Sequence, residues 1–206
     1  MSFTYTGPRL LLLRHGETEW NRQGRLQGRK NSPLTDLGRA QARQQGEILK
    51  KIPGIETFDA VCSPLGRAQE TARIALGAVS KLPRLDSNVA EINAGDWEGK
   101  TFKDIYSAYP QFDEKDLMRM FLTAPGGEGF DGLRDRCVTF LNQLEHPTIL
   151  VSHSVTLCMI RGLIRGLSRQ EIEALSRPQG VVLDVKTGQE TLWSLPLQAD
   201  GFARPQ

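Results

Sequence analysis

The 206-residue sequence predicts an α/β fold in which a mostly parallel sheet lies between two layers of helices. Short apolar runs, typical of buried strands, alternate along the chain with amphipathic stretches typical of helices. Near the carboxyl end the pattern changes, because two strand-like segments flank a short turn that contains glycine. This hairpin would add an antiparallel edge to a sheet whose other strands are joined by right-handed helical crossovers.

Four regular elements are predicted in the first 80 residues. The two strands are recognised by uninterrupted apolar runs. The first helix is expected to begin after Thr35, a favourable N-cap residue, and the second to have Pro64 in its first turn, where a missing N–H costs little. The elements follow one another as a strand at 9–14, a helix at 35–49, a strand at 58–62 and a helix at 64–79.

The second half of the chain repeats the alternation after a different middle segment. Residues 91–132 are rich in glycine, aromatic and charged residues and contain no obvious buried strand, which indicates an insertion with short helices over one end of the sheet. Because no linker or internal repeat divides the sequence, we expect a single domain over residues 1–206. The remaining elements are predicted as a helix at 133–144, a strand at 148–151, a helix at 155–164 and hairpin strands at 181–185 and 190–193.

Composition excludes several classes of protein. The 26 Lys and Arg residues nearly balance 24 Asp and Glu residues, which disfavours both a disordered chain and a nucleic-acid-binding protein. The longest apolar run, 10–13, is too short to span a membrane, and its flanking arginines argue against a secretory leader. Three cysteines at irregular spacing fit neither a disulfide framework nor a zinc motif, so a cytoplasmic location is expected. We expect no nucleic-acid or membrane partner, and a monomer or homodimer.

Polar side chains follow all three predicted buried strands. In open α/β sheets, ligands bind beyond the carboxyl ends of the strands, where helix N-termini offer free N–H groups to anions. Two arginines and two histidines at these ends would form a pocket for a tetrahedral anion, since the arginine fork matches phosphate oxygens. The strand-end sequences are Arg14-His15-Gly16-Glu17, Cys62-Ser63-Pro64-Leu65-Gly66-Arg67 and Ser152-His153-Ser154.

Other interpretations of these residues remain open at this point. A single histidine after a strand is more often a hydrogen-bonded structural group, and Arg67 by itself could be a surface arginine. Between residues 9 and 50, nine Lys/Arg against four Asp/Glu could attract an anionic substrate or form a solvated basic face. Residues 94–101 fit a relaxed P-loop pattern, but Asp96 and Glu98 would repel phosphate there and no buried strand precedes them.

Longer motifs make the anion-site interpretation more specific. Residues 13–21, with Arg14-His15-Gly16 near their start, resemble the signature of the histidine phosphatase superfamily, the phosphoglycerate-mutase-like proteins. Many members have glycine after the second histidine, where this sequence has Ser154. We expect the Ser154 hydroxyl to cap the following helix, with a ligand contact as the alternative. The other matching segments follow in the family's order at 24–28, 33–42, 63–72, 91–99, 125–128 and 151–153.

The resemblance implies roles for five catalytic residues. His15 is the nucleophile that becomes phosphohistidine, and Arg14 and Arg67 clamp the phosphoryl oxygens. His153 donates to the same oxygens. Glu91 is the general acid for the leaving oxygen and then the base for water. Chemistry agrees with these roles, because a neutral imidazole is a competent nucleophile without a metal and a leaving alkoxide needs a positioned acid.

Further side chains are implied in phosphate or substrate binding. Asn21 and Gln27 would hydrogen-bond the phosphoryl group from the side, and Thr18 and the Ser154 N–H are lesser candidates. The resemblance implies no cofactor. No metal is expected, because the arginines beside His15 make a cation costly there.

The implied fold is the phosphoglycerate-mutase-like three-layer fold, with residues 91–132 covering the substrate. The implied activity is hydrolysis of a small phosphate monoester. A cofactor-dependent phosphoglycerate mutase is the alternative, disfavoured because Ile92-Asn93-Ala94-Gly95 replaces the mutases' Arg-His-Tyr-Gly and because the chain is shorter. A non-catalytic phosphate-ligand-binding or scaffold protein is the alternative of another class. α-Ribazole phosphatases and broad-specificity phosphatases resemble this chain equally, so the substrate stays open.

Overall fold

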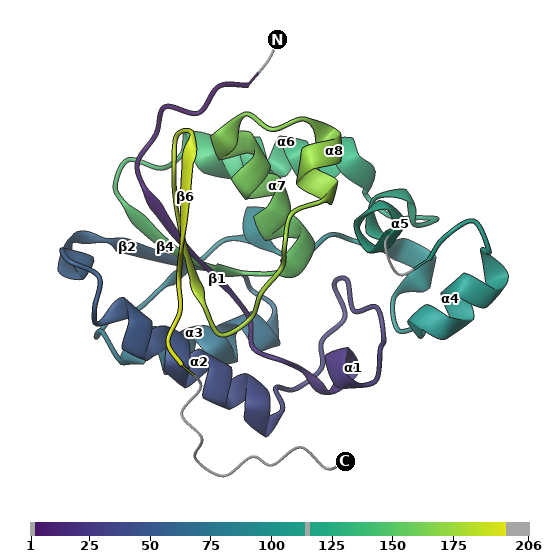
Figure 1. Ribbon diagram of the computed structural model, residues 1–206, viewed down its shortest axis with the longest axis horizontal. Helices are drawn as coiled ribbons and strands as arrows, with labels where there is room; N and C mark the ends of the chain where they lie inside the picture. The colour runs from purple at the N-terminus through teal and green to yellow at the C-terminus, as the bar shows by residue number, and fades with distance from the viewer. Residues whose placement is uncertain (1–2, 114–115, 197–206) are drawn as a thin grey trace.

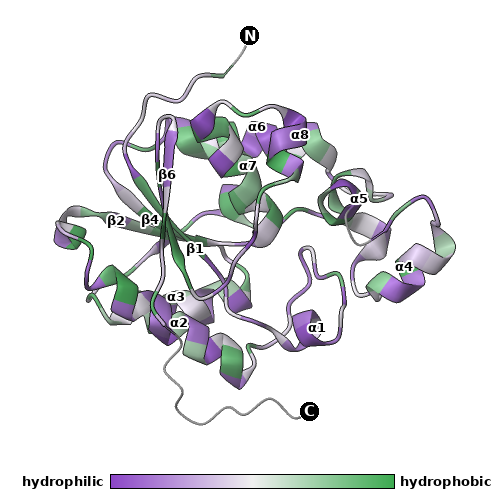
Figure 2. Ribbon diagram, viewed as in Figure 1, coloured by the Kyte–Doolittle hydropathy of each residue, from purple (hydrophilic) through white to green (hydrophobic). Residues whose placement is uncertain are grey.

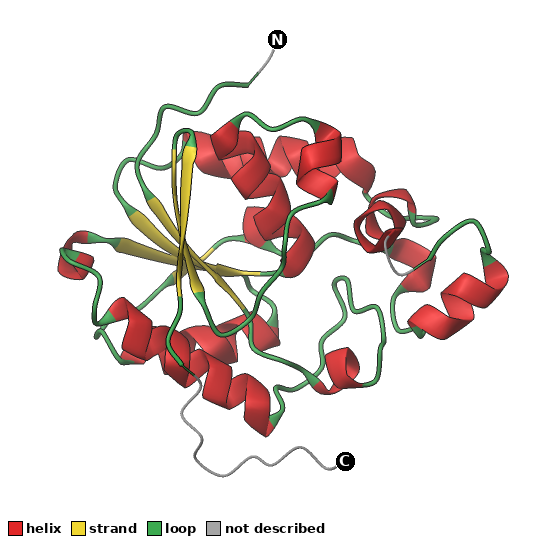
Figure 3. Cartoon of the chain, in the orientation of Figure 1, coloured by secondary structure: helices red, strands yellow, loops and turns green. Residues whose placement is uncertain are grey.

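A six-stranded sheet forms the centre of the computed structural model, which describes residues 3–113 and 116–196 (Figures 1 and 3). Its strand order is β3-β2-β4-β1-β5-β6. The first four of these strands are parallel, whereas β5 pairs antiparallel with both β1 and β6, so the predicted mostly parallel sheet with an antiparallel edge is confirmed. The strands are β1 (Leu10–Arg14), β2 (Asp59–Cys62), β3 (Arg84–Leu85), β4 (Thr148–Ser152), β5 (Val182–Lys186) and β6 (Gln189–Trp193).

Helices cover both faces of the sheet, which confirms the three-layer α/β/α arrangement. In Figure 1, α2 and α3 lie below the strands, and α6, α7 and α8 lie above them. Short 3₁₀ helices lie in the connections, at Ile55–Thr57, Ser87–Val89 and Gly95–Trp97. The α-helices are α1 (Glu19–Arg22), α2 (Asp36–Leu49), α3 (Gly66–Gly77), α4 (Phe102–Ala108), α5 (Leu117–Thr123), α6 (Gly129–Asn142), α7 (Ser154–Arg165) and α8 (Arg169–Glu173).

The leucine run in β1 supplies side chains to both halves of the core. Leu10 and Leu12 pack with residues of α6 and α7, and Leu11 and Leu13 pack with residues of α2 and α3. This division follows from the strand geometry, since successive side chains point to opposite faces. Figure 2 shows the same pattern, with hydrophobic residues concentrated on the central strands. Burying each such leucine contributes about 1.5–3 kcal/mol to folding, so this strand anchors the edge where Arg14 and His15 begin.

Three predicted helix starts are wrong by a short distance. Helix α3 begins at Gly66, and Pro64 precedes it, because the Ser63 hydroxyl accepts a hydrogen bond from Leu65 N and fixes a turn before the helix. Helix α7 begins at Ser154 itself, with His153 as its N-cap residue, so Ser154 does not cap this helix as predicted. The predicted start of α6 at 133 is also late, since this helix begins at Gly129.

Strand β3 and helix α8 are among the elements that were absent from the sequence prediction. Strand β3 has only two residues, both exposed, and therefore lacks the apolar run by which a buried strand is recognised. Helix α8 begins with a capping box, in which the Ser168 hydroxyl accepts from Glu171 N and the Glu171 carboxylate accepts from Ser168 N. The spacing Ser-x-x-Glu is a known start signal, so α8 could have been predicted.

The segment between the two halves of the sheet builds a small core of its own. Helices α4 and α5 lie at the right of Figure 1, away from the strands. Trp97 is buried at their centre, with the ring of Tyr109 4.9 Å and the ring of Phe112 5.8 Å from its own. The cluster is completed by Leu26, Ala94, Ile105, Met120 and Ala124. Across residues 3–113 and 116–196, no helix is long and apolar enough to cross a membrane.

Candidate active site

The carboxyl ends of β1, β2 and β4 bring His15, Arg67 and His153 together, as the strand order predicts. His15 follows β1 and is almost fully buried, and its Nδ1 lies 2.8 Å from Gly16 O. With Nδ1–H donating to this carbonyl, Nε2 keeps its lone pair, toward which Arg67 Nε donates at 3.3 Å. Burial, followed by the charges of Arg67 and Arg14, holds the pKa of His15 well below its usual value. The ring is therefore a neutral nitrogen base at physiological pH.

Arg67, in the first turn of α3, is fixed by the loop that follows α1. Its Nη1 donates to Lys30 O at 2.7 Å and its Nη2 to Gly28 O at 2.8 Å. Burial lowers the pKa of Arg67 to about 10, against the opposing effect of Glu91, so the guanidinium remains charged at neutral pH. Arg67 is thus held by two main-chain carbonyls and the neutral His15 ring, and it makes no ion pair with any carboxylate among the described residues. A buried cation without a countercharge favours binding of an anion.

Arg14, the last residue of β1, supplies the second guanidinium. Its Nη1 donates to Arg177 O, and its Nε is buried without a hydrogen-bond partner among the described residues. Burial is also the main cause that lowers the pKa of Arg14, again to about 10. A buried donor without an acceptor is costly unless a ligand satisfies it.

His153, the N-cap residue of α7, lies beside His15 with the ring centroids 5.1 Å apart. Its Nε2 is 2.7 Å from the Ser63 hydroxyl, and its Nδ1 is buried without a partner in the described chain. Burial, together with the charge of Arg67, lowers the pKa of His153 well below its usual value. Ser63 was named in the strand-end sequence after β2, but it was given no role of its own there.

Glu91 takes the place of a capping side chain for α7. One carboxylate oxygen accepts from Thr156 N and Thr156 Oγ1, both at 3.1 Å, and from Ile92 N at 3.0 Å. The other accepts from Val155 N at 3.2 Å, which leaves room on it for a proton. Free N–H groups at a helix N-terminus stabilise a carboxylate, so this arrangement explains why the cap expected of Ser154 is not needed.

Two glutamines far apart in the sequence hold the backbone of Arg14 and His15. The buried Gln45 side chain of α2 donates to Arg14 O at 3.0 Å and to Val181 O at 3.1 Å. Gln179 donates to His15 O at 2.9 Å. Neither residue was singled out from the sequence, because each acts through the main chain of a distant segment.

The glycine after His15 is required by a close approach of two backbones. A Cβ atom on Gly16 would lie 2.1 Å from Gly38 O, a distance that no side chain tolerates. The loop is further fixed by Gly16 N, which donates to the Thr71 hydroxyl at 3.1 Å. Contacts from α2 and α3 therefore hold the loop that carries His15.

Thr18, Asn21 and Gln27 bind mainly to one another around α1. The Thr18 hydroxyl accepts from Asn21 N at 3.1 Å and from Gln27 Nε2 at 2.7 Å. Asn21 Oδ1 accepts from Thr18 N, which completes a capping box. The structure gives these three side chains no hydrogen bond to His15, Arg67 or the other described catalytic candidates. The Thr18 hydroxyl hydrogen remains available to an anion, and Gln27 Oε1 is buried without a described partner.

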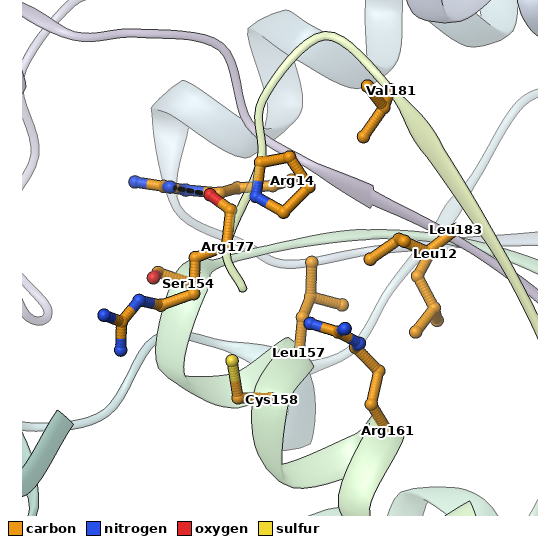
Figure 4. Close-up of a pocket in the computed structure, with 10 residues that line it drawn as sticks. Leu12, Arg14, Ser154, Leu157, Cys158, Arg161, Arg177, Val181 and Leu183 are labelled. Atoms are coloured by element: carbon orange, nitrogen blue, oxygen red, sulfur yellow. Dashed lines mark hydrogen bonds between the residues drawn. The ribbon is translucent and has the colours of Figure 1, made fainter. Parts of the chain in front are cut away.

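Ser154 lies at the edge of a small cavity behind Arg14 (Figure 4). The cavity has a volume of about 10 Å³, enough for about one water molecule and too small for an organic phosphate. Arg177 also lines it, and Arg177 was not singled out from the sequence. Among residues 3–113 and 116–196, no group of three or more His, Cys, Asp and Glu side chains is placed to hold a metal ion. The cationic groups suit the site to an anion.

Known proteins with similar sequences include phosphatases and mutases. A glucosyl-3-phosphoglycerate phosphatase from Mycolicibacterium vanbaalenii is 34% identical over 77% of this chain and 75% of its own length. A Salmonella paratyphi B protein with the name "Probable phosphoglycerate mutase GpmB" is 34% identical over 76% of this chain and 74% of its own length. Three longer mycobacterial relatives are 37% identical over 73% of this chain, which spans only 42% of their length.

The fold comparison agrees with the sequence comparison. The crystal structure of α-ribazole phosphatase from Shigella flexneri matches with a TM-score of 0.72 and 27% identity, over 91% of this chain and 95% of that one. The family model described as histidine phosphatase superfamily, branch 1, matches residues 10–197. The match covers every site residue described above, and the chain therefore belongs to the histidine phosphatase superfamily.

Proposed function

We propose that this protein hydrolyses small phosphate monoesters through a phosphohistidine intermediate on His15. The observation that carries the proposal is the surroundings of His15 Nε2. This neutral nitrogen lies next to the Arg67 guanidinium and the His153 ring, at the end of the sheet where Glu91 meets the N-terminus of α7. A nucleophile, cationic groups and a proton carrier are the parts that phosphoryl transfer to a side chain requires.

In the first step, the phosphate dianion accepts hydrogen bonds from Arg14, Arg67 and His153. His15 Nε2 attacks phosphorus while the bond to the ester oxygen breaks, and Glu91 gives its proton to that leaving oxygen. The guanidinium groups stabilise charge that spreads over the three equatorial oxygens in the transition state. The products of this step are an alcohol and the phosphohistidine.

In the second step, water attacks the phosphohistidine. The Glu91 carboxylate takes a proton from the water, the phosphorus–nitrogen bond breaks, and His15 regains its lone pair as inorganic phosphate leaves. Thr18, Asn21, Gln27 and the Ser154 N–H are the proposed secondary contacts of the phosphoryl group. Positive charge comes from arginine side chains, so we propose that neither step needs a metal ion or another cofactor.

The substrate class is a small phosphorylated metabolite, with no nucleic-acid or membrane partner, and the protein acts in the cytoplasm as a monomer or homodimer. The relatives' names include a glucosyl-3-phosphoglycerate phosphatase and an α-ribazole phosphatase, which support ester hydrolysis on a small molecule. The name of the Salmonella relative favours phosphoglycerate mutase as the second candidate. The non-catalytic alternative is opposed by the presence of every implied catalytic residue.

The test is phosphate release by the wild type and by His15→Ala, with EDTA present. The panel would hold p-nitrophenyl phosphate, 3-phosphoglycerate, sugar phosphates, nucleotides and α-ribazole phosphate. We expect release that resists EDTA, is abolished by His15→Ala and is unchanged in His146→Ala, since His146 is exposed and lies outside the site. Release that persists in His15→Ala would contradict the proposal. Interconversion of 2- and 3-phosphoglycerate without net release would instead identify a mutase.

A further inference from the structure

Arg177, an arginine beside the site, has no side-chain partner among the described residues. Arg177 is half-buried in the connection between α8 and β5, and its Nη1 is fully buried. Across residues 3–113 and 116–196, its guanidinium makes no hydrogen bond and no ion pair. Arg161, which lines the same cavity, is by contrast paired with Glu190 through two hydrogen bonds of 2.8 and 2.6 Å. A buried cationic donor without an acceptor is costly, and it is therefore expected to have a ligand.

The position of Arg177 connects it to the catalytic group. Its carbonyl oxygen accepts a hydrogen bond from Arg14, so the backbone of Arg177 is fixed by a residue of the phosphate clamp. In Figure 4 the guanidinium groups of Arg14 and Arg177 extend to the same side of the cavity, with the Ser154 hydroxyl between them in this view. Gln179, two residues further on, donates to His15 O. The side chain thus lies next to the phosphate site on a segment that His15 and Arg14 hold in place.

The charges of the site leave Arg177 without compensation even when a phosphate ester is bound. The ester is a dianion, and Arg14 and Arg67 are the guanidinium groups proposed to bind it. Glu91 carries a proton in the first proposed step and has no negative charge at that point. It is also bonded to α7 rather than to an arginine. One positive charge therefore remains for a second anionic group.

We propose that Arg177 is a specificity-determining residue that binds a second anionic group of the substrate, a carboxylate or a second phosphate. The proposal rests on the proposed hydrolase function and narrows its substrate class to phosphate esters that carry another negative charge near the ester. Arginine suits both groups, because its planar donors match two oxygens of a carboxylate or of a phosphate.

The first test compares substrate pairs that differ in the second anion. 3-Phosphoglycerate and glycerol 3-phosphate differ by a carboxylate, and fructose 1,6-bisphosphate and fructose 6-phosphate differ by a phosphate. In Arg177→Ala we expect kcat/KM for the doubly anionic member of one pair to fall about 10- to 100-fold, mainly through KM, as expected for loss of a charge-assisted hydrogen bond. Its partner should stay within about twofold. The pair whose doubly anionic member loses activity shows whether Arg177 binds a carboxylate or a phosphate.

Arg43→Ala is the matched control, since Arg43 is exposed on α2 and its loss changes the net charge equally. An equal fall for both members of both pairs would show a structural role only and would overturn the inference. No change for any substrate would overturn it as well.

A binding assay separates this inference from the proposed function. Dissociation constants for the same four esters are measured by calorimetry in His15→Ala and in His15→Ala with Arg177→Ala, where no turnover occurs. Preferential loss of binding by the doubly anionic ester supports the inference even if the wild type hydrolyses nothing, in which case the hydrolase proposal alone is wrong. Equal binding in both backgrounds, or no binding of any ester, would overturn the inference.

Discussion

The end of the sheet and the segment around Trp97 are held together by different means. At the sheet end, main-chain and side-chain hydrogen bonds from several elements fix each charged group, as in the carbonyl oxygens that bind Arg67. The segment around Trp97 is held by an aromatic cluster and by two carboxylates, Glu98 and Glu128, that accept backbone N–H groups. Directional bonds fix geometry more tightly than apolar packing does. We therefore expect the geometry of the charged groups to be fixed more tightly at the sheet end than in the neighbouring segment around Trp97.

The largest effect is expected from a change of Glu91, the proposed proton carrier at the sheet end. Glu91→Gln keeps one oxygen for the N–H groups of α7 but removes the proton. We expect turnover of an alkyl phosphate to fall by about 100-fold or more, with phosphate binding largely intact. The measurement is steady-state turnover together with the inhibition constant of inorganic phosphate.

The leaving group supplies an internal control for this change. The p-nitrophenolate ion can leave without being protonated. In Glu91→Gln, turnover of p-nitrophenyl phosphate should therefore fall much less than turnover of an alkyl phosphate. Unchanged turnover of both esters would remove Glu91 from the proposed mechanism.

A second expectation concerns the pH dependence of folding stability. The buried histidines at the sheet end contribute to this dependence. Because burial lowers the pKa values of His15 and His153, the unfolded chain binds more protons than the folded protein below about pH 6.5. Stability is therefore full above this pH and falls as the pH decreases. Between pH 7 and 5.5 we expect a loss of about 1 kcal/mol for each buried histidine, measured by urea unfolding.

Variants of single histidines show which residue causes this loss of folding stability. His15→Gln should remove about half of the pH dependence, and His146→Ala should leave it unchanged, since His146 is exposed. A pH dependence that survives in His15→Gln at full size would show that His15 is not held neutral by its surroundings.

The smallest effect on catalysis is expected in the segment around Trp97. Trp97→Phe should lower the free energy of unfolding by about 1–2 kcal/mol, because a buried ring becomes smaller within its cluster. Turnover of p-nitrophenyl phosphate should stay within about twofold. The measurements are urea unfolding and steady-state kinetics. A tenfold loss of turnover would contradict the separation between the two regions and would assign this segment a part in the chemistry.

Local patterns in the sequence predicted most of the sheet and the residues at its end. The leucine run of β1 and the capping Thr35 each act within a few residues, and both predictions agree with the structure. The prediction for Ser154 was wrong for a non-local reason, because Glu91, more than sixty residues away, takes over the cap. Gln45 and Gln179 bind main-chain atoms of distant segments, and no local pattern marks such contacts.

The contact between Glu91 and α7 has a consequence for the energetics of the proposed reaction. When Glu91 releases its proton, a negative charge forms where N–H dipoles already point toward it. In water, solvent dipoles would have to reorient around such a charge, whereas the amides of a folded helix are already oriented. Helix α7 thus replaces bulk solvent for this one carboxylate, and the folding of the chain has supplied the reorganisation energy before any substrate arrives.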